Sequence, residues 1–212
     1  MREPAQSATQ VERAWVEVDL YRFFAQALGA PTAERFEWFQ QPNFAAGLAD
    51  LWVEVGTDGN FPGFDFFTAP EEYEATYIAL FDVGVPEPPV PLFESAHYRS
   101  LPAQQVALEN TSFYEVLGLK TDPARSVPDH LLTQLEFLSV VRYLREHAPD
   151  EPTRRTLAQL EKDFLERHLL NWLPVAVQKL ERHEVPAFSI LFSLLLAHLN
   201  QQYRLLANSP LP

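Results

Sequence analysis

Hydrophobic side chains recur at three- and four-residue steps along most of the chain. Trp15, Val18 and Tyr21 form one such stripe, and Gly29 followed by Pro31 ends it. This spacing places apolar groups on one face of a helix, and no segment shows the sustained alternation that is typical of a β-strand. The pattern predicts an all-α protein, a compact domain of about eight or nine helices.

The expected helices end at glycine, at proline or in polar runs. They cover approximately residues 10–28, 33–40, 44–55, 68–84, 101–117, 127–147, 152–183 and 186–205. A break or kink is expected near Pro174, because proline cannot continue the hydrogen bonds of a helix. Two capping boxes are expected, one at Thr68 and Glu71 and the other at Ser126 and Asp129.

The polar stretch 120–126 separates two groups of helices. We therefore expect a single domain over residues 1–212 with an N-terminal lobe at about 10–119, a hinge at about 120–126 and a C-terminal lobe at about 127–207. A hinge of this kind would allow two copies to exchange lobes, so a homodimer formed in that way is an open alternative.

The chain is acidic and contains no cysteine. Its 212 residues include 16 Lys and Arg against 29 Asp and Glu, a formal net charge of −13. Such a field repels nucleic acid and favours a cationic partner, although acidity alone also serves solubility. Without cysteine there is no disulfide, thiolate metal site or cysteine nucleophile.

Targeting and membrane signals are weak. The first ten residues lack the basic and apolar regions of a secretory signal, which argues against export. The longest apolar stretch, 185–199, is interrupted by polar residues and is shorter than the roughly 20 residues that span a bilayer. We expect a buried helix there and no stable membrane insertion.

Motifs for catalysis or metal binding are not evident. The six histidines show no ligand spacing, and the sequence contains no phosphate-binding glycine loop or nucleophile elbow. The sequence therefore predicts neither an enzyme nor a metal site, and it indicates no cofactor.

Candidate binding chemistry lies in two segments. The proline-rich run 86–91 forms a stiff loop that leads to Phe93 and Glu94. Phe93 either anchors the loop in the core or lines a surface for an apolar peptide, where Glu94 would meet a cation. The favoured interpretation of Asp129 is that it caps a helix. Its functional interpretation is that it binds an arginine side chain. His168 is expected in the core, hydrogen-bonded internally.

An ordered set of landmarks carries a family resemblance. They are Tyr77-Ile78-Ala79-Leu80-Phe81, Pro91-Leu92-Phe93-Glu94-Ser95 with Tyr98, Pro128-Asp129-His130, Leu135-Glu136-Phe137, and Phe164-Leu165 with His168 and Trp172. In this order and spacing the chain resembles the TorD/DmsD/NarJ family of molybdoenzyme chaperones, also called redox-enzyme maturation proteins. The landmarks cover about half of the chain.

The resemblance implies a TorD-like fold and a cytoplasmic chaperone. Such a protein binds the apo catalytic subunit of a molybdopterin oxidoreductase, and in many members its twin-arginine leader, and assists cofactor insertion, assembly and export proofreading. The implied peptide-binding residues are Tyr77, Phe81, Pro91, Phe93, Glu94, Ser95, Asp129 and His130. Some members have Trp at the position of Phe93 and Gly at that of Glu94, so leader specificity does not carry over.

Three alternatives remain open at this point. Within the family, a NarJ-like chaperone binds the core of its enzyme and no exported leader. A helical protein that binds a small molecule or nucleotide would show turnover or a tight stoichiometric ligand. A structural assembly subunit would stay with its partner permanently instead of making transient contact.

Overall fold

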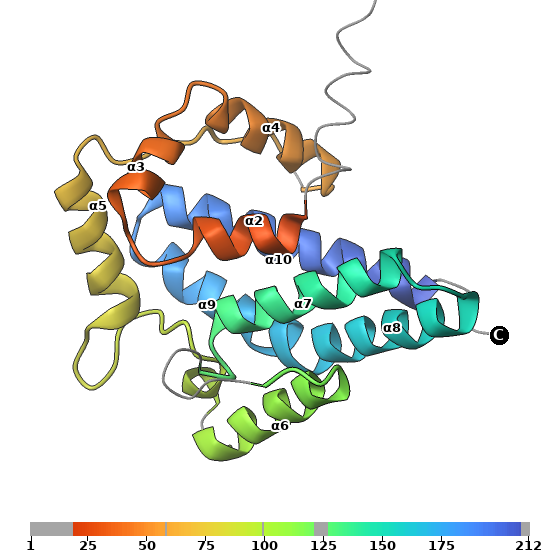
Figure 1. The fold of residues 1–212 in the computed structure, drawn as a ribbon. Coiled ribbons are helices and arrows are strands. Elements are labelled where there is room, and N and C mark those ends of the chain that lie inside the picture. The colour runs from red at the N-terminus through yellow and green to blue at the C-terminus, as the bar shows by residue number, and fades with distance from the viewer. Residues whose placement is uncertain (1–18, 58, 99, 121–126, 209–212) are drawn as a thin grey trace, which may run out of the picture.

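Figure 1 shows the fold of this computed structural model, which describes residues 19–57, 59–98, 100–120 and 127–208. The α-helices are α2 (Leu20–Ala27), α3 (Ala33–Phe39), α4 (Phe44–Glu54), α5 (Pro70–Tyr77), α6 (Ala103–Val116), α7 (Leu131–Glu146), α8 (Glu151–Phe164), α9 (Leu170–Glu181) and α10 (Pro186–Asn208). Two π-helical turns, η1 (Ile78–Asp82) and η3 (Leu165–Leu169), and one 3-10 turn, η2 (Glu94–His97), complete them.

The all-α prediction is confirmed. The described residues form no strand, and an isolated antiparallel bridge joins Phe93 to His130. The expected first helix appears as α2, and residues 10–18 of that expectation lie outside the described part of the chain. None of the helices in the described ranges is long and apolar enough to cross a membrane.

The core forms around α10, the longest helix. In Figure 1, α2 lies in front of α10, α7 runs beside α8, and α6 lies below them. α10 buries side chains on most of its circumference, among them Phe188 and Phe192, which are fully buried. Burying side chains of this size stabilises a fold by roughly 1.5–3 kcal/mol each.

Helices of both expected lobes share this core. α2 packs against α7 and α10, and its capping residue Asp19 also accepts a hydrogen bond from the Ser139 hydroxyl of α7. The expected hinge lies almost wholly in residues 121–126, outside the described residues. The division into two lobes therefore stays a prediction, as does lobe exchange between copies.

Both expected helix starts differ in the structure, and Ser126 of the second expected capping box lies outside the described residues. The helix expected from 127 begins as α7 at Leu131, where the Nδ1 atom of His130 accepts from the Leu132 N–H at 3.2 Å. His130, and not Asp129, is thus the capping residue, because the chain before it is held extended against residues 92–94. α5 is preceded by Ala69 without a side-chain cap, and Pro70 supplies the preset φ of its first turn.

The long helix expected at 152–183 is interrupted by η3. Pro174 itself lies inside α9, and the π-helical turn ends at Leu169, immediately before Leu170. Leu170 is four residues before Pro174, so its carbonyl is the one that the proline ring crowds and leaves without an N–H donor. The distortion therefore falls one turn before the proline.

The proline-rich loop leaves η1 and folds back on itself. The Val90 N–H donates to the Leu80 carbonyl at 2.9 Å, and Val90 is fully buried. Gly84 lies against the opposite side of the loop, where an added Cβ would be 2.1 Å from the Glu87 carbonyl oxygen. Only a residue without Cβ fits this approach.

Gly84→Ala is expected to destabilise the protein by about 1–3 kcal/mol, because the loop backbone must move to accommodate the methyl group. Urea denaturation gives the free energy of unfolding, and limited proteolysis reports opening between Val83 and Val90. An unchanged midpoint with unchanged cleavage would contradict the tight packing of this loop.

Candidate functional site

Two segments far apart in sequence, Pro91–Ser95 and Asp129–His130, pair along one side of the candidate site. We call these two segments the wall. The Glu94 N–H donates to the Asp129 carbonyl at 2.9 Å, and the Leu131 N–H donates to the Leu92 carbonyl at 2.8 Å. The Ser95 N–H also donates to Oδ2 of Asp129 at 3.1 Å. The structure therefore brings together the Pro91–Ser95 and Asp129–His130 residues that the sequence singled out.

Phe93 and His130 form the outer side of this wall. Both are partly exposed, and their rings meet edge to face with centroids 4.9 Å apart. Burial lowers the pKa of His130 from its ordinary value, against the opposing charge of Asp129. The imidazole is therefore mainly neutral at pH 7, and the pair presents an aromatic, uncharged surface.

Glu94 lies behind the wall at 2% exposure, inside a polar cluster. Its carboxylate accepts from the Gln134 amide at 2.6 Å, the Asn110 amide at 2.9 Å and the Tyr98 hydroxyl at 3.0 Å. His168 Nδ1 lies 3.0 Å from the same carboxylate. We call this set, Glu94, Tyr98, Asn110, Gln134 and His168, the Glu94 cluster.

The Glu94 cluster connects the wall to the rest of the fold. Its members come from η2 and the residue after it, from α6, from α7 and from η3. Trp172 on α9 extends it, since its Nε1 donates to Gln134 Oε1 at 3.2 Å. The internal hydrogen bonding expected of His168 is confirmed.

The carboxylates of Asp129 and Glu94 are both buried, which limits the arginine contacts expected of them. Asp129 is 3% exposed and its Oδ2 accepts from the wall itself, while all four donors around Glu94 are internal. In this conformation a partner's arginine does not reach Glu94. The burial of Glu94 favours a role in positioning the wall, and the direct cation contact that the sequence suggested stays a prediction.

The remaining expected residues lie deeper. Tyr77 and Phe81 are 3% and 2% exposed, and both rings contact Phe188 of α10. Pro91 is buried, and its carbonyl lies 2.9 Å from Nε2 of His97. These residues support the loop from inside and present no surface of their own to a peptide.

Sequence reasoning missed two residues of the Glu94 cluster. Asn110 and Gln134 are fully buried amides on helices α6 and α7, and neither belongs to a motif. A polar residue on the buried face of an amphipathic helix is the signal that was available, because buried amides need partners. The sequence could not say which partners they meet.

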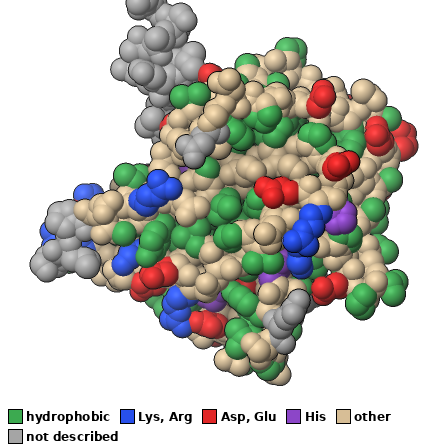
Figure 2. Space-filling model, turned by 180° about the vertical axis from the view of Figure 1, so that it is seen from behind, with side chains coloured by type: hydrophobic (Ala, Val, Ile, Leu, Met, Phe, Trp, Pro, Cys, Tyr) green, Lys and Arg blue, Asp and Glu red, His purple; other side chains and the backbone are tan. Residues whose placement is uncertain are grey.

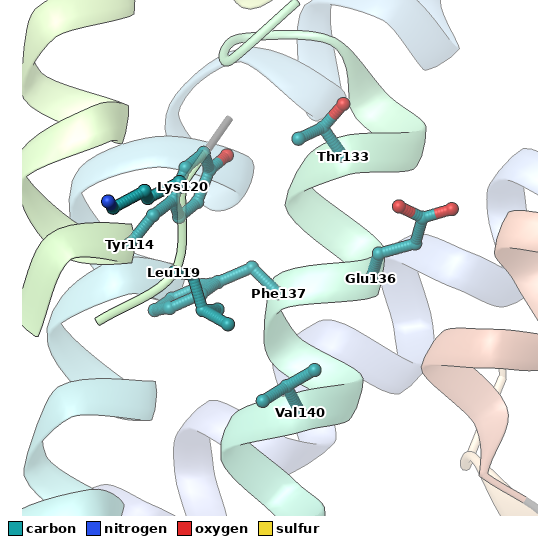
Figure 3. Close-up of a pocket in the computed structure, with 7 residues that line it drawn as sticks. All are labelled: Tyr114, Leu119, Lys120, Thr133, Glu136, Phe137 and Val140. Atoms are coloured by element: carbon teal, nitrogen blue, oxygen red, sulfur yellow. The ribbon is translucent and has the colours of Figure 1, made fainter. Parts of the chain in front are cut away.

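A hollow of about 230 Å³ opens beside the wall (Figure 3). Leu119 and Phe137 lie at its centre, and Thr133, Glu136 and Val140 line its α7 side. Tyr114 connects the two features, because it lines the hollow and its hydroxyl donates to the Pro128 carbonyl at 2.6 Å. The lining is mostly apolar, with Lys120 and Glu136 at its edge.

Within the described residues, no group of three or more His, Cys, Asp or Glu side chains is arranged to hold a metal ion. The geometry instead defines a rigid, partly aromatic surface on an all-helical protein. A surface of this kind can bind an apolar segment with little loss of its own conformational freedom.

Comparisons with known proteins agree with one another. Over 118 residues, 52% of this chain, the protein is 37% identical to the selenate reductase assembly chaperone protein of Thauera selenatis. It is 33% identical over 139 residues to the chlorate reductase assembly chaperone protein of Ideonella dechloratans, covering 64% of this chain and 70% of that protein. The match to the perchlorate reductase assembly chaperone protein of Dechloromonas aromatica (strain RCB) has 27% identity and covers 78% of each chain.

The chain spans 58% of the length of the selenate reductase chaperone. A solved structure, a putative redox enzyme maturation protein from Archaeoglobus fulgidus, is 15% identical and aligns over 90% of this chain and 93% of its own, with a TM-score of 0.47. That likeness is loose, so the assignment of this all-helical protein rests on sequence.

A family model described as nitrate reductase delta subunit matches residues 67–178. This range includes the whole wall and the Glu94 cluster. The chain belongs to the nitrate reductase delta subunit family, which confirms the resemblance drawn from the landmark residues.

Proposed function

We propose that this protein is an assembly chaperone, and not an enzyme, for the catalytic subunit of a molybdopterin oxidoreductase. The observation that carries the proposal is the identity of 27–37% to assembly chaperones of selenate, chlorate and perchlorate reductases. The chaperone would hold the subunit before its cofactor is inserted and act in the cytoplasm.

The candidate binding surface consists of Phe93, His130 and the adjoining hollow. A twin-arginine leader has a basic region followed by an apolar one, and its apolar part suits this aromatic surface. The net charge of −13 attracts the basic part without a dedicated ion pair. Holding such a leader until assembly is complete would delay export, which is the proofreading role.

The rigidity of the wall supports this role. Paired backbone hydrogen bonds at 2.8 and 2.9 Å and the buried Glu94 cluster hold Phe93 in place before a partner arrives. A preorganised surface loses little entropy on binding, so a small apolar contact area suffices for micromolar affinity.

The test is calorimetric titration of the protein with the leader of the molybdopterin enzyme encoded nearest to it. Micromolar binding, about −8 kcal/mol, is expected for the wild type. The variant Phe93→Ala/His130→Asn should bind at least about tenfold more weakly, because it loses the aromatic pair. Asparagine is a good N-cap, so α7 keeps its start.

A matched control lies at the other end of the same helix. Tyr143 and His147 form a second aromatic pair, with ring centroids 4.2 Å apart, and His147 follows the last residue of α7. Tyr143→Ala/His147→Asn should leave leader affinity unchanged. Equal losses in both variants would contradict the assignment of the surface.

A folded wild type that does not bind the leader would favour the alternative of a contact with the enzyme core. The whole apo catalytic subunit then replaces the leader in the titration. Absence of binding to both the leader and the subunit would overturn the proposed function.

A further inference from the structure

The negative charge of the protein is concentrated in one part of the chain. Residues 36–98 contain eleven of the 29 acidic residues and none of the 16 basic residues. The rest of the chain carries 18 acidic residues against 16 basic ones, and is almost neutral. The field that attracts cations therefore originates from α3, α4, α5 and the proline-rich loop.

The figures show where this segment lies. α3, α4 and α5 form the upper and left part of Figure 1, and the same side is on the right in Figure 2. Acidic side chains spread over the upper right of Figure 2, whereas basic side chains lie mainly on the left, with a further basic group on the right at about mid-height. The molecule thus has an acidic side and a nearly balanced side.

An apolar ledge projects from the acidic side. Val85 is 99% exposed, Val83 is 63% exposed and Ile78, at the start of η1, is 36% exposed. Single exposed apolar residues are ordinary, but three within eight residues on a loop anchored by buried Val90 form a fixed patch. We call Ile78, Val83 and Val85 the valine ledge.

Carboxylates lie close to the valine ledge in sequence. Asp82, the last residue of η1, precedes Val83, Glu87 follows Val85 in the loop, and Glu74 lies one helical turn before Ile78; all three are exposed. Of the basic side chains, Lys179 acts with Glu87 on the charge of His97, and Arg35 acts with Asp82 on that of Tyr77, so the carboxylates are only partly balanced. A segment that covers the ledge is complementary if it combines apolar side chains with positive charge.

The chain leads from the ledge to the candidate site. From Val85 it reaches Phe93 in eight residues, and the second half of that stretch is held by hydrogen bonds between Val90 and Leu80 and between Leu92 and Leu131. A segment of roughly ten residues in extended form is about 30 Å long, enough to lie along both.

We propose that the valine ledge is the first docking surface for a basic and apolar segment of the partner protein, which then reaches Phe93 and His130. The inference rests on the proposed function and adds where the partner first binds. The acidic side raises the rate of encounter, and the ledge retains the segment after contact.

Association and dissociation rates of the full chain with the apo catalytic subunit test this proposal, measured at low and moderate salt. Glu74→Gln/Asp82→Asn/Glu87→Gln should lower the association rate about tenfold at low salt and flatten its dependence on salt. Val83→Ser/Val85→Ser should raise the dissociation rate about tenfold and leave the association rate nearly unchanged.

The control removes the same charge from the balanced side. Glu115, Glu166 and Glu181 are exposed residues of α6, η3 and α9. Glu115→Gln/Glu166→Gln/Glu181→Gln should change the association rate less than about twofold. Equal effects of the two charge variants, or rates unaffected by the serine variant, would overturn the ledge as a docking surface.

The outcomes separate the two proposals. If the wild type binds the subunit and the ledge variants behave like the wild type, only the docking inference fails. If the wild type does not bind the subunit at all, the proposed function fails and the inference fails with it.

Discussion

Replacing Glu94 by alanine is expected to lower the free energy of unfolding by about 3–5 kcal/mol, because the substitution leaves several donors of a polar cluster without their shared acceptor. The carboxylate is 2% exposed and accepts from the Gln134, Asn110 and Tyr98 side chains. Without it, the Gln134 and Asn110 amides and His168 Nδ1 stay buried with too few acceptors.

The chemistry of the cluster predicts a graded series. Glu94→Gln keeps one acceptor oxygen and the side-chain volume, so its cost should be about half that of Glu94→Ala. Glu87→Ala, at an exposed position seven residues earlier, is the control and should change stability by less than about 0.5 kcal/mol. Urea denaturation at pH 7 measures all three free energies of unfolding.

A double-mutant cycle tests whether the cluster acts as a unit. Because Asn110 donates to the Glu94 carboxylate at 2.9 Å, Glu94→Ala and Asn110→Ala should together cost less than the two separate losses. Additive losses, or a Glu94→Ala variant as stable as the wild type, would contradict the positioning role of the cluster.

Acid should destabilise the protein through His198. This side chain is 1% exposed, its ring lies 5.2 Å from that of Tyr21, and neither ring nitrogen has a hydrogen-bond partner among the described residues. Burial, with a smaller contribution from the positive charge of Arg142, lowers the pKa of His198 from 6.5 to about 3. The folded protein therefore holds this imidazole neutral.

The direction in which stability changes with pH follows from the number of protons bound by the folded and unfolded states. Below pH 6.5 the unfolded chain takes up a proton at His198 that the folded protein does not, so stability is lost as the pH falls toward about 3. The slope for one such group is about 1.4 kcal/mol per pH unit, which amounts to about 2–3 kcal/mol between pH 6.5 and pH 4.5.

The measurement compares the wild type with His198→Leu. Burial also lowers the pKa values of His97 and His130 and raises that of Glu161, so other groups titrate over the same range. Their contributions cancel in the difference between the two proteins. The stability of the leucine variant relative to the wild type should rise as the pH falls; parallel pH profiles would contradict the prediction.

The sequence predicts some helix boundaries more accurately than others. Helical periodicity and the positions of Gly and Pro place α3, α4 and α10 within a few residues of where they form, because these signals act over a few residues. The start of α7 was misplaced by four residues, since His130 takes the cap only when the chain before it is paired with residues 92–94.

By itself, the sequence determined the all-α class, the acidic charge and the family landmarks, all of which depend on residue type and local spacing. Only the tertiary structure decided that Glu94 is buried, that Asn110 and Gln134 meet it, and that Phe93 faces outward beside His130. These contacts join residues that are 16 to 40 positions apart in the sequence. Their geometry depends on how helices pack, which no local pattern encodes.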